Sequence, residues 1–69
     1  MSAITLTNLG KQAAENTTSS GPEFAVLSLL YESSGPMDFE EIMDATHMDE
    51  EKASMVTRRL IGKGLVREV

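Results

Sequence analysis

The sequence contains no cysteine, and it has only one histidine and two prolines among its 69 residues. Without cysteine, disulfide bonds, thiolate catalysis and cysteine-ligated zinc are excluded for these residues. A lone histidine, His47, also argues against most metal clusters, so we expect neither a metal nor another cofactor. A chain of this length buries only about 60% of the surface that it exposes when unfolded, so its core should be marginal.

Long hydrophobic runs are absent as well. The first twelve residues, MSAITLTNLGKQ, carry no basic segment followed by an apolar stretch, so we expect neither a secretory signal nor a membrane span. The interpretation is a cytoplasmic protein without a membrane partner. The apolar share of 41% is ordinary for a folded chain, and the length predicts a single domain over residues 1–69.

Basic residues are scarce in the first two-thirds of the chain. Lys11 is the only one before Lys52, whereas ten of the eleven acidic residues precede Lys52. The net charge of −5 therefore combines an acidic body with a basic C-terminal third. This asymmetry indicates an anionic partner, and a solvated helix face explains it equally well.

The spacing of apolar residues predicts a mostly α-helical fold with a small β-sheet. Residues 4–7 alternate apolar and polar side chains, which is typical of a half-buried strand, and residues 65–69 close the chain as a second strand. Between them, helices are expected over residues 8–16, 22–33, 38–46 and 49–62. Residues 16–21 have no periodicity and are expected to form a polar loop.

Polar residues and glycine support these helix boundaries. Thr7 or Asn8 is expected to cap the first helix. Asp38 and Glu41 have the spacing of a capping box, in which each side chain accepts a hydrogen bond from the other residue's backbone amide. Gly64 is the expected left-handed residue that stops the last helix.

Apolar side chains at three- and four-residue steps indicate which side of each helix faces the core. The second helix is apolar over so wide an arc that it should be the central element. The residues expected to face inward are Leu9 and Ala13 in the first helix, Phe24, Leu27, Leu30 and Tyr31 in the second, Phe39, Ile42 and Met43 in the third, and Ala53, Val56, Leu60 and Ile61 in the fourth.

Three stretches of the second half carry a resemblance to a known family. They are GPMDFEEI at positions 35–42, Met48–Asp49 before the last helix, and LIGKGLV at positions 60–66. With them, residues 22–69 resemble the winged helix-turn-helix of MarR-like regulators. The N-terminal ITLTNLGK, at positions 4–11, is similar to the segment with which such families form the second wing strand and begin a C-terminal helix.

In this chain the similar segment precedes the three helices instead of following them, so the resemblance implies a permuted order. We therefore predict that strand 4–7 pairs antiparallel with strand 65–69. Pairing elsewhere, or within a dimer, is the alternative. The permutation also implies that no hairpin loop joins the two strands, so that a wing contact to DNA is lost or weakened.

The resemblance further implies a transcriptional regulator that places helix 49–62 in the major groove of duplex DNA. The expected DNA-binding residues are Lys52, Ser54, Thr57, Arg58, Arg59 and Lys63. For Arg58 and Arg59 the alternative is an ion pair with the acidic body, and for Thr57 it is partial burial. Glu50 and Glu51 count against DNA, because they would repel phosphates at the start of the helix.

A protein-interaction module without nucleic-acid binding is the alternative function. An exposed patch around Met48 and Met55 would favour a protein partner, whereas a continuous basic strip on helix 49–62 would favour DNA. A homodimer is a further possibility, since the core is small and a sheet edge is open. An enzyme is not expected, because no nucleophile and base converge on His47 and the acidic clusters suit helix starts.

Overall fold

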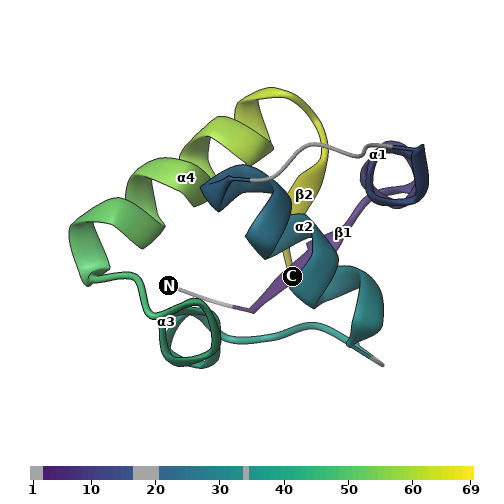
Figure 1. Ribbon diagram of the computed structural model, residues 1–69. Helices are drawn as coiled ribbons and strands as arrows, with labels where there is room; N and C mark the ends of the chain where they lie inside the picture. The colour runs from purple at the N-terminus through teal and green to yellow at the C-terminus, as the bar shows by residue number, and fades with distance from the viewer. Residues whose placement is uncertain (1–2, 17–20, 34) are drawn as a thin grey trace.

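The computed structural model describes residues 3–16, 21–33 and 35–69, so most of the loop predicted over 16–21 lies outside the described residues. The elements follow the order β1 (Ile4–Leu6), α1 (Asn8–Asn16), α2 (Pro22–Glu32), α3 (Phe39–Thr46), α4 (Glu50–Gly62) and β2 (Val66–Glu68) (Figure 1). Each bound differs from its predicted position by at most one residue. The predicted mostly helical fold with a small antiparallel sheet is confirmed.

The helix boundaries have the local causes that the sequence indicates. Thr7 caps α1, because its Oγ1 accepts a hydrogen bond from the Gly10 amide at 3.0 Å. The capping box of α3 is complete: Asp38 Oδ1 accepts from the Glu41 amide at 3.0 Å, and Glu41 Oε1 accepts from the Asp38 amide at 3.1 Å. Gly64 has a φ of 76°, the left-handed conformation expected after α4.

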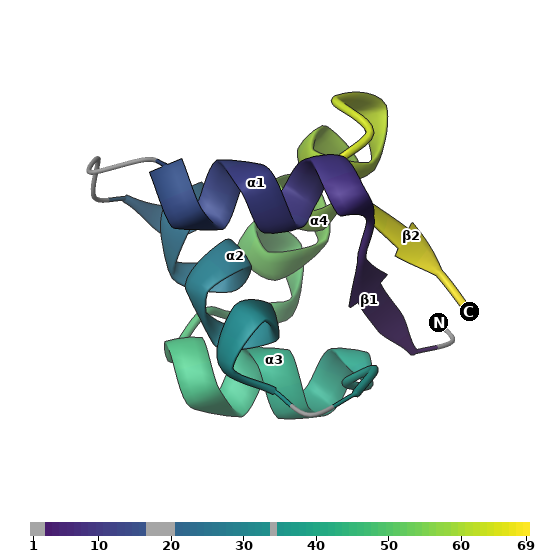
Figure 2. The ribbon, with the colours of Figure 1, turned by 90° about the vertical axis from the view of Figure 1, so that its right-hand side faces the viewer.

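The two strands pair antiparallel, with Ile4 opposite Glu68 and Leu6 opposite Val66. Figure 2 shows them side by side, which confirms the predicted pairing of the first and last strands. β1 also has a neighbour on its other edge, which the sequence pattern does not predict. The Ile4 amide donates to the Met37 carbonyl at 2.7 Å, and the Met37 amide donates to the Ile4 carbonyl at 2.9 Å. β1 is therefore the central strand between two flanking segments.

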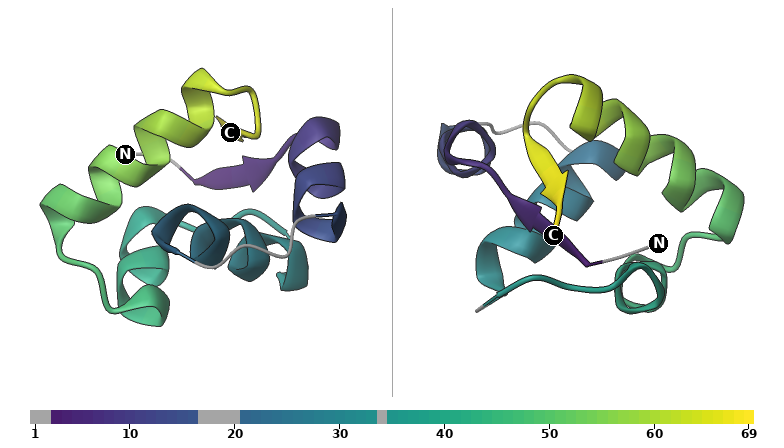
Figure 3. Two further views of the ribbon diagram at one scale, coloured as in Figure 1. Left: turned by 45° about the horizontal axis from the view of Figure 1, so that its top comes forward. Right: turned by 180° about the vertical axis from the view of Figure 1, so that it is seen from behind.

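α2 is the central helix, as predicted, and it contacts α1, α3, α4 and β1. In the right-hand view of Figure 3, the paired strands lie between α1 on one side and α3 and α4 on the other. The buried apolar residues come from every element except α1: Ile4, Leu6, Val26, Leu27, Leu30, Ile42, Ala53, Val56, Leu60 and Val66. Within the described ranges, every helix is too short or too polar to span a bilayer.

Three of the residues predicted to face the core lie at the surface instead. Leu9 is 54% exposed because α1 turns the neighbouring Gly10 toward the sheet. Tyr31 is 43% exposed, and its hydroxyl donates a hydrogen bond to Glu15 Oε2 at 2.6 Å. Ile61 is 36% exposed, because the adjacent Leu60 occupies the inward position of the last turn of α4. Phe24, Phe39 and Met43 are half-buried.

Candidate functional site

A tight turn sets the direction of α4, the helix that carries the predicted site. His47 adopts the left-handed conformation, with φ 59°, and ends α3. Two residues later Asp49 caps α4, because its Oδ1 accepts a hydrogen bond from the Lys52 amide at 2.8 Å. α3 and α4 therefore form a helix pair joined by only three residues.

Burial on one side of α4 fixes which residues face solvent. Ala53, Val56 and Leu60 are buried against the core. At about 100° per residue, Glu51 and Arg58 lie on the opposite side of the helix. The residues that line a shallow depression on this side, here named the α4 face, are Glu50, Glu51, Ser54, Met55, Arg58 and Arg59.

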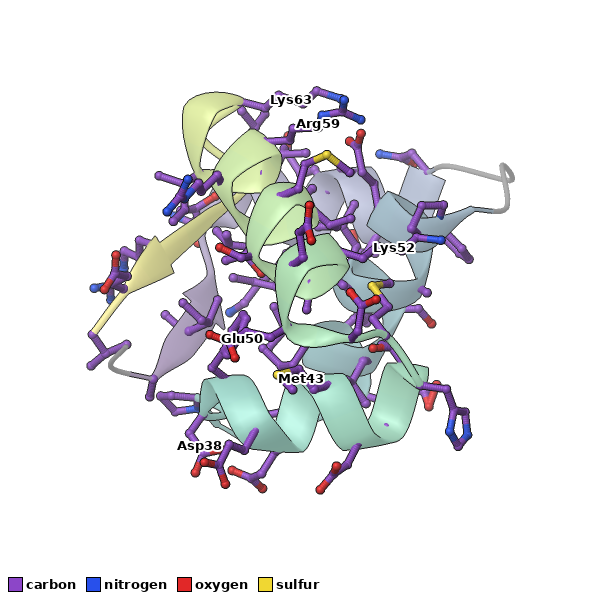
Figure 4. All side chains as sticks on the ribbon, turned by 90° about the vertical axis from the view of Figure 1, so that its left-hand side faces the viewer. Asp38, Met43, Glu50, Lys52, Arg59 and Lys63 are labelled. Atoms are coloured by element: carbon purple, nitrogen blue, oxygen red, sulfur yellow. The ribbon has the colours of Figure 1, made fainter. Side chains whose placement is uncertain are left out.

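The α4 face is divided by charge along its length. Figure 4 shows Glu50 at the end of α4 beside α3, and Arg59 and Lys63 at the opposite end. Arg58 and Arg59 are exposed, and neither forms an ion pair with a described carboxylate. The alternative reading, in which the acidic body neutralises these two arginines, is thus not observed among the described residues.

The other predicted contact residues differ in exposure and in pairing. Lys52 is exposed on the flank of α4, and Ser54 is half-buried within the α4 face. Lys63 forms an ion pair with Glu23 of α2, with 2.7 Å between Nζ and Oε1. The two residues are 40 positions apart, so no local sequence signal indicates this pair. Lys63 can bind a phosphate only when it leaves Glu23, and exposed pairs of this kind are weak.

Thr57 does not belong to the exposed site, and its prediction as a DNA contact is corrected. Its side chain is fully buried on the side of α4 that also buries Val56 and Leu60. Its Oγ1 has no hydrogen-bond partner among the described residues. Helical periodicity places Thr57 near the edge of the buried arc, and the packing of the core then encloses it.

We expect Thr57→Val to raise the free energy of unfolding by about 1 kcal/mol, because valine has nearly the same shape and removes a buried hydroxyl without a partner. The measurement is urea unfolding followed by circular dichroism. Thr46→Val is the matched control, since Thr46 Oγ1 donates a hydrogen bond to the Ile42 carbonyl at 2.6 Å. Because that substitution removes a hydrogen bond, it should not raise the free energy of unfolding. A less stable Thr57→Val variant would contradict the described burial.

Where α1 meets α2, the Tyr31 hydroxyl donates a hydrogen bond to Glu15. The hydrogen bond from Tyr31 to Glu15 raises the pKa of the Tyr31 phenol, because ionisation would place two negative oxygens 2.6 Å apart. Both side chains are exposed. Among the described residues, no group of three His, Cys, Asp or Glu side chains has the arrangement of a metal site.

Arg67 is the basic residue of the C-terminal third that lies outside the predicted DNA-binding set. It is exposed on β2 and lies opposite Thr5 in the strand register.

Comparison of the chain with protein-family models, with curated proteins and with solved structures gives no match in any of the three. The geometry and charge of α4 are therefore the basis for assigning a function.

Proposed function

We propose that this protein is a cytoplasmic, winged-helix-type regulator that binds duplex DNA by placing α4 in the major groove. The observation that carries this proposal is the exposure of Arg58 and Arg59 on the side of α4 that faces away from the core. A major groove about 12 Å wide admits one helix, and arginine pairs well with guanine edges and with phosphates. The half-buried Ser54 adds a short hydrogen-bonding group between the charged ends.

The arrangement of the neighbouring elements supports the same proposal. α3 and α4 are joined by a tight turn, as in a helix-turn-helix unit, and α2 packs against both. The pairing of β1 with β2 is the one that a permuted winged helix requires. Together these features agree with the permuted winged helix-turn-helix on which the predicted DNA contact depends.

Charge restricts where along α4 the contact occurs. Glu50 and Glu51 are exposed in the first turn and repel phosphates, so the binding half is the C-terminal one. Arg58 and Arg59 act there, and Lys63 joins them when a phosphate replaces Glu23. With few phosphate contacts and an acidic body, the affinity should be in the range of non-specific binding, with a dissociation constant of about 10⁻⁵ M.

Fluorescence anisotropy of a labelled mixed-sequence duplex at low salt tests the proposal. We expect Arg58→Ala to weaken binding about tenfold, and Arg58→Ala with Arg59→Ala to abolish it. Glu50→Gln with Glu51→Gln should have the opposite effect and strengthen binding about tenfold, because two repulsive charges are removed. A wild-type chain that binds no duplex, even at low salt, would reject the function.

Two controls accompany these variants. Lys11→Ala removes a positive charge from α1, away from the α4 face, and should leave the affinity nearly unchanged. Glu40→Gln removes a negative charge from the exposed side of α3 and should strengthen binding much less than the change at Glu50 and Glu51. Equal effects of the site and control variants would show that only net charge matters.

One observation favours the second candidate function, a protein-interaction module. Met55 is 47% exposed in the middle of the α4 face, where a duplex offers it no apolar partner other than thymine methyl groups. The basic residues of the α4 face, Arg58 and Arg59, also lie at one end of it and do not form a continuous strip. A protein partner that covers Met55 would use the same face.

A further inference from the structure

The charges of the α4 face are arranged so that they cannot neutralise one another within the helix. The residues four positions after Glu50 and Glu51 are Ser54 and Met55, so neither acid has a base at the spacing that pairs on a helix. Glu51 and Arg58 are seven residues apart, which is about 10 Å along the axis. The acidic and the basic end therefore remain available to another molecule.

We propose that a second copy of this chain docks on the α4 face, with the two α4 helices antiparallel. A two-fold axis that passes between Ser54 and Met55 brings Glu51 of each copy opposite Arg58 of the other. The attraction is formed twice, because an isologous interface repeats every contact. Glu50 and Arg59 flank these central pairs, and each acidic end lies over a basic end. A parallel arrangement would place like charges together, so charge selects the antiparallel one.

The centre of the α4 face suits a close contact between two helices. Met55 is 47% exposed and would pack against Met55 of the second copy, near the two-fold axis. Ser54 is small, so it does not obstruct approach at this point of the face. Helices that pack through such positions come to about 8–10 Å of each other. Burial of the methionine then adds an apolar contribution to the charge pairs.

The expected dimer is weak and reversible. A single helix face contributes less area than the roughly 1,200 Å² at which stable protein interfaces begin. Exposed charge pairs are screened by salt, so the dimer should dissociate as the ionic strength rises. Self-association does not depend on the proposed DNA binding, but the two uses exclude each other because both cover Arg58. At high concentration the dimer would therefore mask the DNA-binding surface.

Sedimentation equilibrium at low salt, from about 10 µM to about 1 mM, tests the dimer in the range where an interface of this size associates. We expect wild type to form dimers at the upper end. Glu51→Arg and Arg58→Glu should each weaken self-association by about tenfold or more, because each places like charges opposite one another twice. An equimolar mixture of the two variants should associate again as a heterodimer, because both central pairs regain opposite charges.

Glu40→Arg is the matched control, with the same change of charge on the exposed side of α3. Its average mass in solution should equal that of wild type at each concentration. The interface is rejected if wild type stays monomeric throughout, if the mixture does not associate, or if Glu40→Arg acts as strongly as Glu51→Arg. Species larger than a dimer would also reject the two-fold interface, because they require a head-to-tail contact between copies. Glu51→Arg retains the DNA-binding arginines, so loss of the dimer alone leaves the proposed function intact.

A crosslinking measurement covers the case in which a charge reversal prevents folding. The chain has no cysteine, so Met55→Cys introduces a single thiol at the two-fold axis. Diamide, a thiol oxidant, takes two hydrogens from two such thiols and leaves one disulfide between the copies. We expect Met55→Cys to crosslink much faster than Gln12→Cys, a control on the exposed side of α1. Equal rates for the two variants would overturn the arrangement.

Discussion

Replacement of Gly10 by alanine is expected to destabilise the protein by about 3 kcal/mol, near the upper end of the usual cost of overpacking. A Cβ atom at position 10 would lie 1.9 Å from the carbonyl oxygen of Leu65 and 2.9 Å from its carbonyl carbon. Both atoms belong to the backbone, so no side-chain rotation relieves the clash. α1 would have to move away from the turn that contains Leu65.

Hydrogen bonds on both sides of Leu65 oppose that movement. The Leu65 amide donates to the Leu60 carbonyl at 2.9 Å, and the Leu65 carbonyl accepts from the Thr7 amide at 3.1 Å. Thr7 Oγ1 also donates to the Gly64 carbonyl at 2.6 Å. The start of α1 is thus bound to the turn between α4 and β2, and glycine at position 10 permits this close approach.

Gly62→Ala is the matched control for Gly10→Ala, because both glycines are helical and only Gly10 is enclosed. Alanine at position 62 should raise the free energy of unfolding by about 1 kcal/mol through its better helix propensity. Urea unfolding followed by far-ultraviolet circular dichroism measures both changes. If Gly10→Ala is as stable as wild type, α1 does not pack against the backbone of Leu65 in this way.

Ile4→Ala is expected to lower the free energy of unfolding by about 2–5 kcal/mol, the usual range for truncation of a buried isoleucine. Ile4 is 0% exposed and belongs to the main apolar core. A chain of this size has a total stability of only about 3–10 kcal/mol. The variant should therefore lose a large part of the total stability of the fold.

The loss can be assigned to the side chain, because alanine keeps the backbone hydrogen bonds between Ile4 and Met37. Ile4→Val should cost about 1 kcal/mol, since it removes one methylene group. Leu9→Ala removes as many carbon atoms as Ile4→Ala, but from a position that is 54% exposed, and it should cost much less. Comparable losses at positions 4 and 9 would show that β1 is not central to the core. Thermal and urea unfolding of all three variants provide the comparison.

The sequence predicts most of the fold because the signals that start and stop these helices are local. The capping box of Asp38 and Glu41 connects residues three positions apart, and Gly64 acts through its own backbone angle. Apolar periodicity likewise identifies the inward side of α4. It gives an arc and not a sharp edge. It placed Ile61 inside, where the structure exposes it, and it left Thr57 between a DNA contact and partial burial, where the structure buries it fully.

The candidate site was predictable in part for the same reason. Arg58 and Arg59 lie opposite the buried residues of α4, and a helical wheel is sufficient to place them. The ion pair between Lys63 and Glu23 joins α4 to α2 and has no local signal. Whether an exposed lysine or arginine forms an ion pair depends on which helix lies beside it.

By itself, the sequence determined the type and bounds of the elements and the division of α4 into an acidic and a basic end. The tertiary structure alone decided that Met37 flanks β1, that Gly10 meets the backbone of Leu65 and that Thr57 is enclosed. The physical reason is range. Helix caps, helix propensity and periodicity act over about four residues, so they can be read along the chain. Contacts between distant segments depend on how all the elements pack around α2, and no short stretch of sequence specifies that packing.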